Sequence, residues 1–203
     1  KSFLKGLIAD YWFLTEDILD EDIYYALEVY LFHETYDFYK DTTIDQVIRK
    51  MLNVTKEKLN SIKNELDSSK FSVHEVLTMA SIIEKEANKS EDRRMVSQVI
   101  YKRLEENMSL GMDVTSYYGV QKDMGEKLLA VDLNDKNPYN TRVVTFIGLP
   151  IGPICNPSLE SIKAALNPAN TDYLYFVADI TSGDVYFAKD ENGFNELVKK
   201  YIK

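Results

Sequence analysis

One stretch of the sequence specifies a buried helix more strongly than any other. Ser72 and Glu75 have the S-x-x-E spacing of a capping box, in which each side chain accepts a hydrogen bond from the other residue's backbone N–H. An apolar run over residues 76–83 follows directly. A helix with so few polar positions has little to present to water, so we expect the chain to fold around it.

Two carboxylates stand at the C-terminal end of this apolar run. Glu84 and Glu86 flank Lys85, and on a helical wheel they lie on opposite shoulders of the apolar face. A partly desolvated carboxyl at either position would have a raised pKa and could act as a general acid near neutral pH. Alternatively, both are boundary residues that pair with nearby Lys and Arg side chains. Periodicity alone does not choose between the two glutamates.

Residues 108–157 are rich in glycine and proline, which leaves room only for short strands. Long irregular stretches inside a compact domain often carry function. Here short hydrogen-bonding side chains stand beside tyrosines, a combination that suits a sugar ring. The same residue types also form Asx and ST turns, so a purely structural role is the alternative. The candidate binding residues are Asp113, Thr115, Tyr118, Tyr139, Asn140 and Thr141.

The order of patterns predicts an α+β fold, with a helix-rich front part and the capped helix packed near a small antiparallel sheet. We expect helices over residues 16–30, 42–54, 55–69, 90–107, 158–166 and 193–203. Two β-rich runs, 172–179 and 184–190, are joined by the sequence "ITSG", which predicts a hairpin.

Charge and motifs exclude several classes of function. The net charge of −9 argues against nucleic-acid binding, which needs clustered Lys and Arg. Neither H-E-x-x-H nor a glycine-rich nucleotide-binding motif is present, so we expect no metal and no cofactor. The single cysteine, Cys155, cannot form an intramolecular disulfide. The apolar opening "FLKGLIADYWFL" is too short to span a bilayer.

Several segments, taken in order, resemble the YceG-like family of endolytic murein transglycosylases. They are "YLFHETYDF", "ASIIEKEA", "RRMVSQVIYKRLEENMSLGMDVTSYYG", "PYNT" and "GLPIGPICNPSLESIKAALNPANTDYLYFVAD". The resemblance covers roughly residues 26–203 and rests on the ordered set rather than on one motif. It implies that residues 26–203 form a catalytic domain and residues 1–25 a helical remnant of a preceding subdomain.

The resemblance also implies an activity. The family cleaves peptidoglycan glycan strands internally and without water, leaving 1,6-anhydro-muramic acid ends. Its acid is the first glutamate of the E-K-E element, which here is Glu84, and the acid role predicts a raised pKa for that carboxyl. Glu86 would then have a structural role on the opposite shoulder of the helix, next to the site. The six candidate binding residues named above would orient the substrate. Expected partners are glycan strands and cell-wall synthesis proteins. The expected location is the extracytoplasmic face of a bacterial membrane, held by an N-terminal anchor outside this chain.

Two alternatives stay open, and departures from the family pattern motivate the first. Val29 and His33 replace a glycine and a proline, and three further positions of the loop pattern also differ. These three are Ser109, Gly111 and Val114. One alternative is an inactive glycan-binding scaffold with the same fold. The other is a muramidase in which Glu84, Asp113 and a water molecule hydrolyse the bond.

Overall fold

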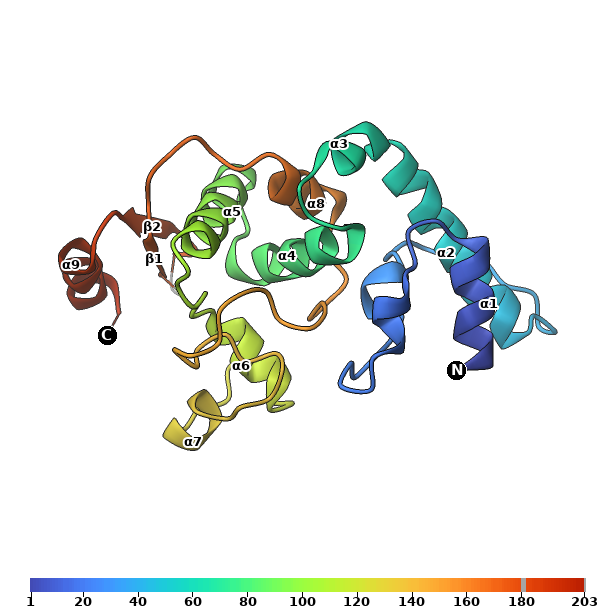
Figure 1. The fold of residues 1–203 in the computed structure, drawn as a ribbon, viewed down its shortest axis with the longest axis horizontal. Helices are drawn as coiled ribbons and strands as arrows, with labels where there is room; N and C mark the ends of the chain where they lie inside the picture. Colours follow the sequence, from blue (N-terminus) through green and yellow to red (C-terminus); the bar gives the residue numbers. More distant parts are fainter. Residues whose placement is uncertain (180–181, 203) are drawn as a thin grey trace.

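A computed structural model of the chain describes residues 1–179 and 182–202 (Figure 1). The elements, in chain order, are α1 (Ser2–Asp10), η1 (Glu16–Leu19), η2 (Glu28–Tyr30), α2 (Ile44–Asn60), α3 (Lys63–Ser68), α4 (Val73–Glu86), α5 (Ser90–Glu105), α6 (Asp113–Gly119), α7 (Ala130–Leu133), α8 (Leu159–Leu166), β1 (Tyr175–Ala178), β2 (Val185–Ala188) and α9 (Glu191–Tyr201). None of the described helices is long and apolar enough to cross a membrane.

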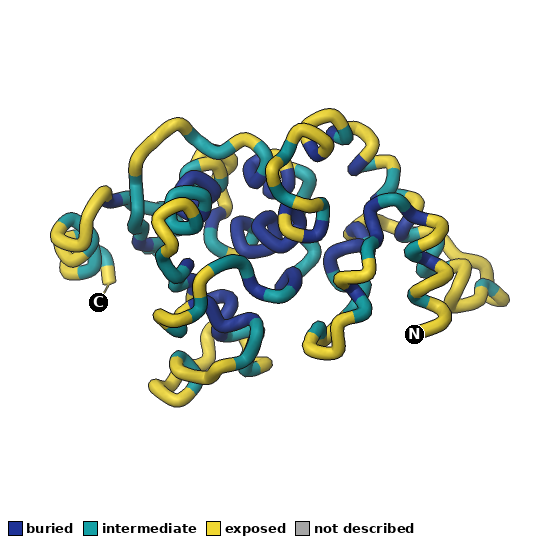
Figure 2. The backbone as a smooth tube through the Cα atoms, viewed as in Figure 1, coloured by how far each residue is buried: buried dark blue, intermediate teal, exposed yellow. Residues whose placement is uncertain are grey.

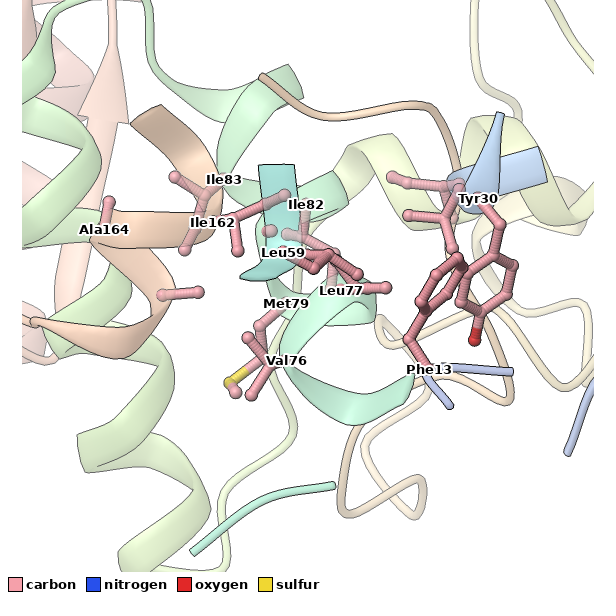
Figure 3. Packing of buried hydrophobic residues seen from close by; sticks show 14 of the residues in the cluster. Phe13, Tyr30, Leu59, Val76, Leu77, Met79, Ile82, Ile83, Ile162 and Ala164 are labelled. Carbon is pink, nitrogen blue, oxygen red and sulfur yellow. The ribbon is translucent and has the colours of Figure 1, made fainter. Parts of the chain in front are cut away.

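Helix α4 lies at the centre of the molecule and packs against α5 and α8 (Figure 1). Both halves of the predicted capping box form, because Glu75 N donates to Ser72 Oγ at 3.2 Å and Ser72 N donates to Glu75 Oε2 at 2.8 Å. Residues 76–83 are all buried, and most of α4 is drawn as buried in Figure 2. Side chains of α4 belong to one hydrophobic cluster with Ile162 of α8 and Leu59 of α2 (Figure 3).

The prediction of one helix over residues 16–30 is wrong. The chain forms two short 3₁₀ turns, η1 and η2, with an irregular segment between them. Asp20 accounts for the interruption, since its Oδ1 accepts a hydrogen bond from the N–H of Asp22 at 2.9 Å. A local side-chain acceptor of this kind offers the backbone an alternative to the helical hydrogen bond.

The start predicted for the second helix is confirmed, but its end is not. Thr43 caps α2, which then continues through Thr55 to Asn60. Thr55 was expected to begin a separate helix, but it is buried inside α2, where its Oγ1 donates to Tyr30 O at 2.6 Å. The same oxygen accepts from Phe32 N at 3.2 Å. Because its hydroxyl bonds to the η2 segment, this threonine connects two elements rather than starting one.

The α+β class is confirmed. Residues 108–157 are mostly irregular, with only the short helices α6 and α7. Strands β1 and β2 pair antiparallel, with Tyr175 opposite Ala188, and α9 packs against them. The sheet connects to α5 through Arg103, whose Nε donates to Leu174 O at 2.7 Å. The predicted hairpin turn falls partly on residues 180–181, which lie outside the described residues.

The N-terminal segment shares a hydrophobic core with the rest of the chain. Leu7 is fully buried, and the ring of Phe13 stacks on that of Tyr30 with centroids 6.1 Å apart (Figure 3). Both belong to the same cluster as the buried residues of α4. The division between residues 1–25 and 26–203 therefore stays a prediction.

Candidate active site

The two glutamates at the end of α4 face different elements, as their positions on opposite shoulders of the helix predict. Glu84 faces the N-terminus of α8, where its carboxylate meets Ser158 and Ser161. Glu86 faces the N-terminus of α6, where the backbone N–H of Val114 donates to its carboxylate. The two carboxyls therefore have separate environments, and each can be assigned a separate chemistry.

Glu84 is held as a carboxylate. Its Oε2 accepts three hydrogen bonds, from Ser158 N at 3.0 Å, Ser158 Oγ at 2.7 Å and Ser161 Oγ at 2.6 Å. Arg93 Nη2 approaches its Oε1 at 3.5 Å. Burial alone would raise the pKa of Glu84, but these hydrogen bonds and the positive charge of Arg93 together lower it below its ordinary value. The raised pKa predicted for this carboxyl is wrong.

Glu86 has the opposite environment. Burial raises the pKa of its carboxyl to about 8, and the negative charge of Asp113 adds to the effect. The single hydrogen bond from Val114 N opposes the shift without cancelling it. A carboxyl in this setting carries its proton at neutral pH, which is the state that a general acid needs.

Asp113, the first residue of α6, stands on the solvent side of this pair. Its side chain is 57% exposed, and its Oδ1 lies 3.0 Å from Arg142 Nη1. Of the predicted binding residues, Asp113 is therefore one that substrate can reach. On the sequence alone, Asp113 is the second carboxylate that would act beside Glu84, whereas in the structure its charge acts on Glu86.

Four of the other predicted binding residues are fully buried: Thr115, Tyr139, Asn140 and Thr141. Their polar atoms bond to the protein. The amide nitrogen of Asn140 donates to the carbonyls of three residues of the 132–135 segment, and its Oδ1 accepts from Ser116 Oγ at 2.7 Å. Thr115 Oγ1 and Thr141 Oγ1 are 2.8 Å apart. The turn-forming alternative describes these contacts, which fix the irregular region against α6.

Tyr118 is half-buried, and its hydroxyl donates to Glu28 Oε2. Burial raises the pKa of Glu28, although the bond from Tyr118 opposes this. The rings of Tyr118 and Tyr139 meet edge to face at 4.8 Å, and the ring of Tyr24 stacks on Tyr118 and is tilted against Tyr139. The sequence interpretation had not singled out Glu28, because the contact joins residues 90 positions apart.

Three more residues of the site were also missed. Ser158 and Ser161 follow Pro157 in a helix-start pattern, so capping chemistry alone could have placed a ring of donors there. Arg93 was included only among the nearby Lys and Arg side chains that could pair with either glutamate, whereas its side chain is 11% exposed and reaches both Glu84 and Glu160. The packing of α4 against α8 determines which carboxylate accepts hydrogen bonds from these donors. A local sequence pattern does not contain that information.

Comparison with known proteins decides the relationship. The sequence profile of the YceG-like family matches residues 6–200. The chain belongs to the YceG-like family. The crystal structure of a YceG-like protein from Listeria monocytogenes superposes with a TM-score of 0.90 at 40% identity, covering 97% of this chain and 64% of that one.

Two curated relatives of this YceG-like chain carry the name endolytic murein transglycosylase. The protein from Bacillus subtilis is 40% identical over 190 residues, which is 93% of this chain and 52% of the relative. The protein from Streptococcus pneumoniae strain D39 is 35% identical over 209 residues, covering all of this chain and 37% of the relative. The chain thus spans between about a third and a half of the length of these relatives.

Proposed function

We propose that this chain is the glycan-cleaving part of an endolytic peptidoglycan lytic transglycosylase, with Glu86 as its general acid and then its base. Family membership and the names of the relatives support the activity. The observation that carries the choice of residue is the contrast between the two environments. Glu84 Oε2 accepts three hydrogen bonds and Arg93 lies 3.5 Å from Oε1, which favours the carboxylate. Burial and the charge of Asp113 instead favour the protonated form of Glu86. Glu84, the residue to which the family pattern points, stays the alternative acid, and the experiment below separates the two.

The chemistry needs one carboxyl in two protonation states. Glu86 donates its proton to the glycosidic oxygen as the bond from C1 breaks and positive charge develops on the sugar. The resulting carboxylate then takes the proton of the muramic acid C6 hydroxyl as the C6 oxygen bonds to C1. The products are a 1,6-anhydro end and a free hydroxyl on the leaving sugar, and Glu86 ends as it began.

Glu84 has a positioning role in this scheme. Its carboxylate ties the C-terminal end of α4 to the start of α8 through Ser158 and Ser161. That contact fixes the direction in which the last turn of α4 presents Glu86, which is two residues further on. Loss of Glu84 should therefore weaken the site less than loss of Glu86.

One observation favours a second function, that of a water-using muramidase. Asp113 lies close enough to Glu86 for its charge to raise the pKa of that carboxyl. Paired carboxylates are what hydrolysing glycosidases use, with one as acid and the other as base or nucleophile. In this case Glu86 protonates the leaving oxygen and Asp113 activates water, and the products carry reducing ends.

The location follows from the substrate. Peptidoglycan lies outside the bacterial cytoplasmic membrane, so we place the action of this chain on that side. An anchor and partner proteins of the cell-wall synthesis machinery stay predictions based on the family.

The test is digestion of purified sacculi by the chain and by two matched variants, Glu86→Gln and Glu84→Gln. Mass spectrometry of the products identifies their ends. We expect anhydro ends from the unmodified chain, a loss of about 100-fold or more for Glu86→Gln, and most of the rate retained by Glu84→Gln. Circular dichroism confirms that each variant is folded.

The other outcomes each point elsewhere. Reducing ends in place of anhydro ends would assign the muramidase reaction. Loss confined to Glu84→Gln would return the acid to the residue that the family pattern names. A folded chain that binds sacculi and releases nothing would be the glycan-binding scaffold, and it would overturn both enzymatic proposals.

A further inference from the structure

An arginine lies beside the proposed acid on a rigid piece of backbone. The side chain of Arg142 is 42% exposed, and its Nη1 lies 3.0 Å from Asp113 Oδ1. Its backbone N–H donates to Asn140 Oδ1 at 3.0 Å. The preceding residue, Thr141, is fully buried and accepts a hydrogen bond from Met112 N through its Oγ1 at 3.1 Å. The backbone under Arg142 is therefore fixed while its guanidinium reaches solvent.

The guanidinium of Arg142 has more N–H donors than its ion pair with Asp113 uses. A guanidinium offers five N–H groups, and within residues 1–179 and 182–202 the acidic partner of Arg142 engages only Nη1. The ion pair with Asp113 is largely exposed, so it contributes little stability and can be shared with a ligand. An exposed, pre-positioned guanidinium is a good receptor for a carboxylate, which it binds through two parallel hydrogen bonds.

A second arginine adds positive charge at the same place. Arg103 is largely buried and directs Nη1 at the carbonyls of Ser109 and Leu110, at 3.2 and 2.7 Å. It is close enough for the charge of Arg142 to lower its pKa, after the larger effect of burial. Two cations thus flank the segment that leads into Asp113, in a chain whose net charge is −9. This local positive charge favours an anionic ligand beside Glu86, the proposed acid.

We propose that Arg142 binds a carboxylate of the glycan substrate next to the bond that is cleaved, so that the site selects acidic strands. This inference rests on the proposed function. The carboxylate has two possible sources: the lactyl ether of a muramic acid without a peptide, or the stem peptide attached to that group. Both present the same chemistry to the guanidinium.

The test measures binding in a cleavage-deficient background, Glu86→Gln. Soluble strand fragments are prepared with stem peptides and without them, and each is also converted to neutral methylamides at its carboxyls. Adding Arg142→Gln should weaken binding of carboxylate-bearing fragments about tenfold and leave binding of the amidated fragments unchanged. Loss with only one of the two acidic fragments identifies the source of the carboxylate.

Two further variants control for charge and for the ion pair. Lys163→Gln removes one positive charge from the exposed face of α8 and should not change the preference. Asp113→Asn breaks the pair but leaves the guanidinium in place, so the preference for acidic fragments should persist. The inference is overturned if Arg142→Gln weakens acidic and amidated fragments equally, or if Asp113→Asn abolishes the preference as completely as Arg142→Gln does.

Failure of the proposed function has a separate signature. In that case the unmodified chain releases no products from sacculi, whatever the binding results show. A carboxylate preference that depends on Arg142 in such a chain would leave the inference standing for a glycan-binding protein.

Discussion

The two glutamates at the end of α4 should make the stability of the fold depend on pH in opposite directions. For Glu86 the folded pKa of about 8 lies above the ordinary value of 4.5. Below pH 4.5 both the folded and the unfolded chain carry the proton, so the stability of the fold is not reduced by the Glu86 carboxyl there. Between the two pKa values the unfolded chain releases the proton and the folded chain retains it, so folding becomes less favourable as pH rises.

The size of the effect follows from the shift. The difference between the two pKa values is about 3.5 pH units, and each unit corresponds to about 1.4 kcal/mol. Glu86 should therefore cost the fold up to about 5 kcal/mol between about pH 4.5 and pH 8. Glutamine at this position has a similar shape and does not titrate, so Glu86→Gln removes this cost.

The assay is urea unfolding of the unmodified chain and Glu86→Gln at about pH 5, 7 and 9. We expect the variant to gain stability relative to the unmodified chain at about 1.4 kcal/mol per pH unit, until the gain levels off above about pH 8. Taking the difference between the two proteins cancels the titration of all other groups. Carbon-13 NMR of the Glu86 carboxyl gives its pKa independently.

Glu84→Gln provides the matched control. The folded pKa of Glu84 is lowered, so its stabilising contribution is present above the ordinary value and is lost as pH falls through the folded pKa. The unmodified chain should therefore lose stability relative to this variant below about pH 4.5, and not in the alkaline range. A flat difference between the unmodified chain and Glu86→Gln from about pH 5 to 9 would show that Glu86 is ionised in the fold, and the proposed acid would be wrong.

Two further variants test the support of the site. Asn140→Ala removes an amide that bonds three carbonyls and Ser116, so it should lower the free energy of unfolding by about 3 kcal/mol, measured with urea. A raised KM at unchanged stability would restore the substrate role predicted for this residue. Ser72→Ala breaks the capping box of α4 and should cost about 1 kcal/mol by the same measurement, and a cost near zero would mean that packing alone fixes the helix start.

The elements that could be predicted are those whose signals are local. The S-x-x-E cap and the apolar run that follows define α4, and both lie within about a dozen residues. The start of α2 at Thr43 and the hairpin strands are local in the same way. The failures at residues 16–30 and at Thr55 arise where a side chain bonds to backbone outside the helical pattern. At Thr55 the partner is Tyr30, 25 residues away.

The candidate site likewise has features that local sequence patterns predict and features that they do not. The positions of Glu84 and Glu86 on opposite shoulders of α4 follow from a period of 3.6 residues. The burial of Thr115, Tyr139, Asn140 and Thr141 does not follow from the sequence, since turn residues and sugar-binding residues are of the same types. Their polar atoms bond to protein partly through contacts that join residues 24 to 29 positions apart and, for Tyr139, 115 positions apart.

The sequence by itself determined the fold class, the central helix and the presence of two carboxylates at its end. Tertiary structure decided which groups surround each of them and, through those groups, the direction in which the pKa of each shifts. The pKa of a carboxyl depends on the donors, charges and burial around it, and for these two glutamates those groups come from α8 and α6. The N-terminus of α8 and Arg93 favour the carboxylate of Glu84, whereas burial and Asp113 favour the protonated form of Glu86. These partners meet α4 only when the chain is folded.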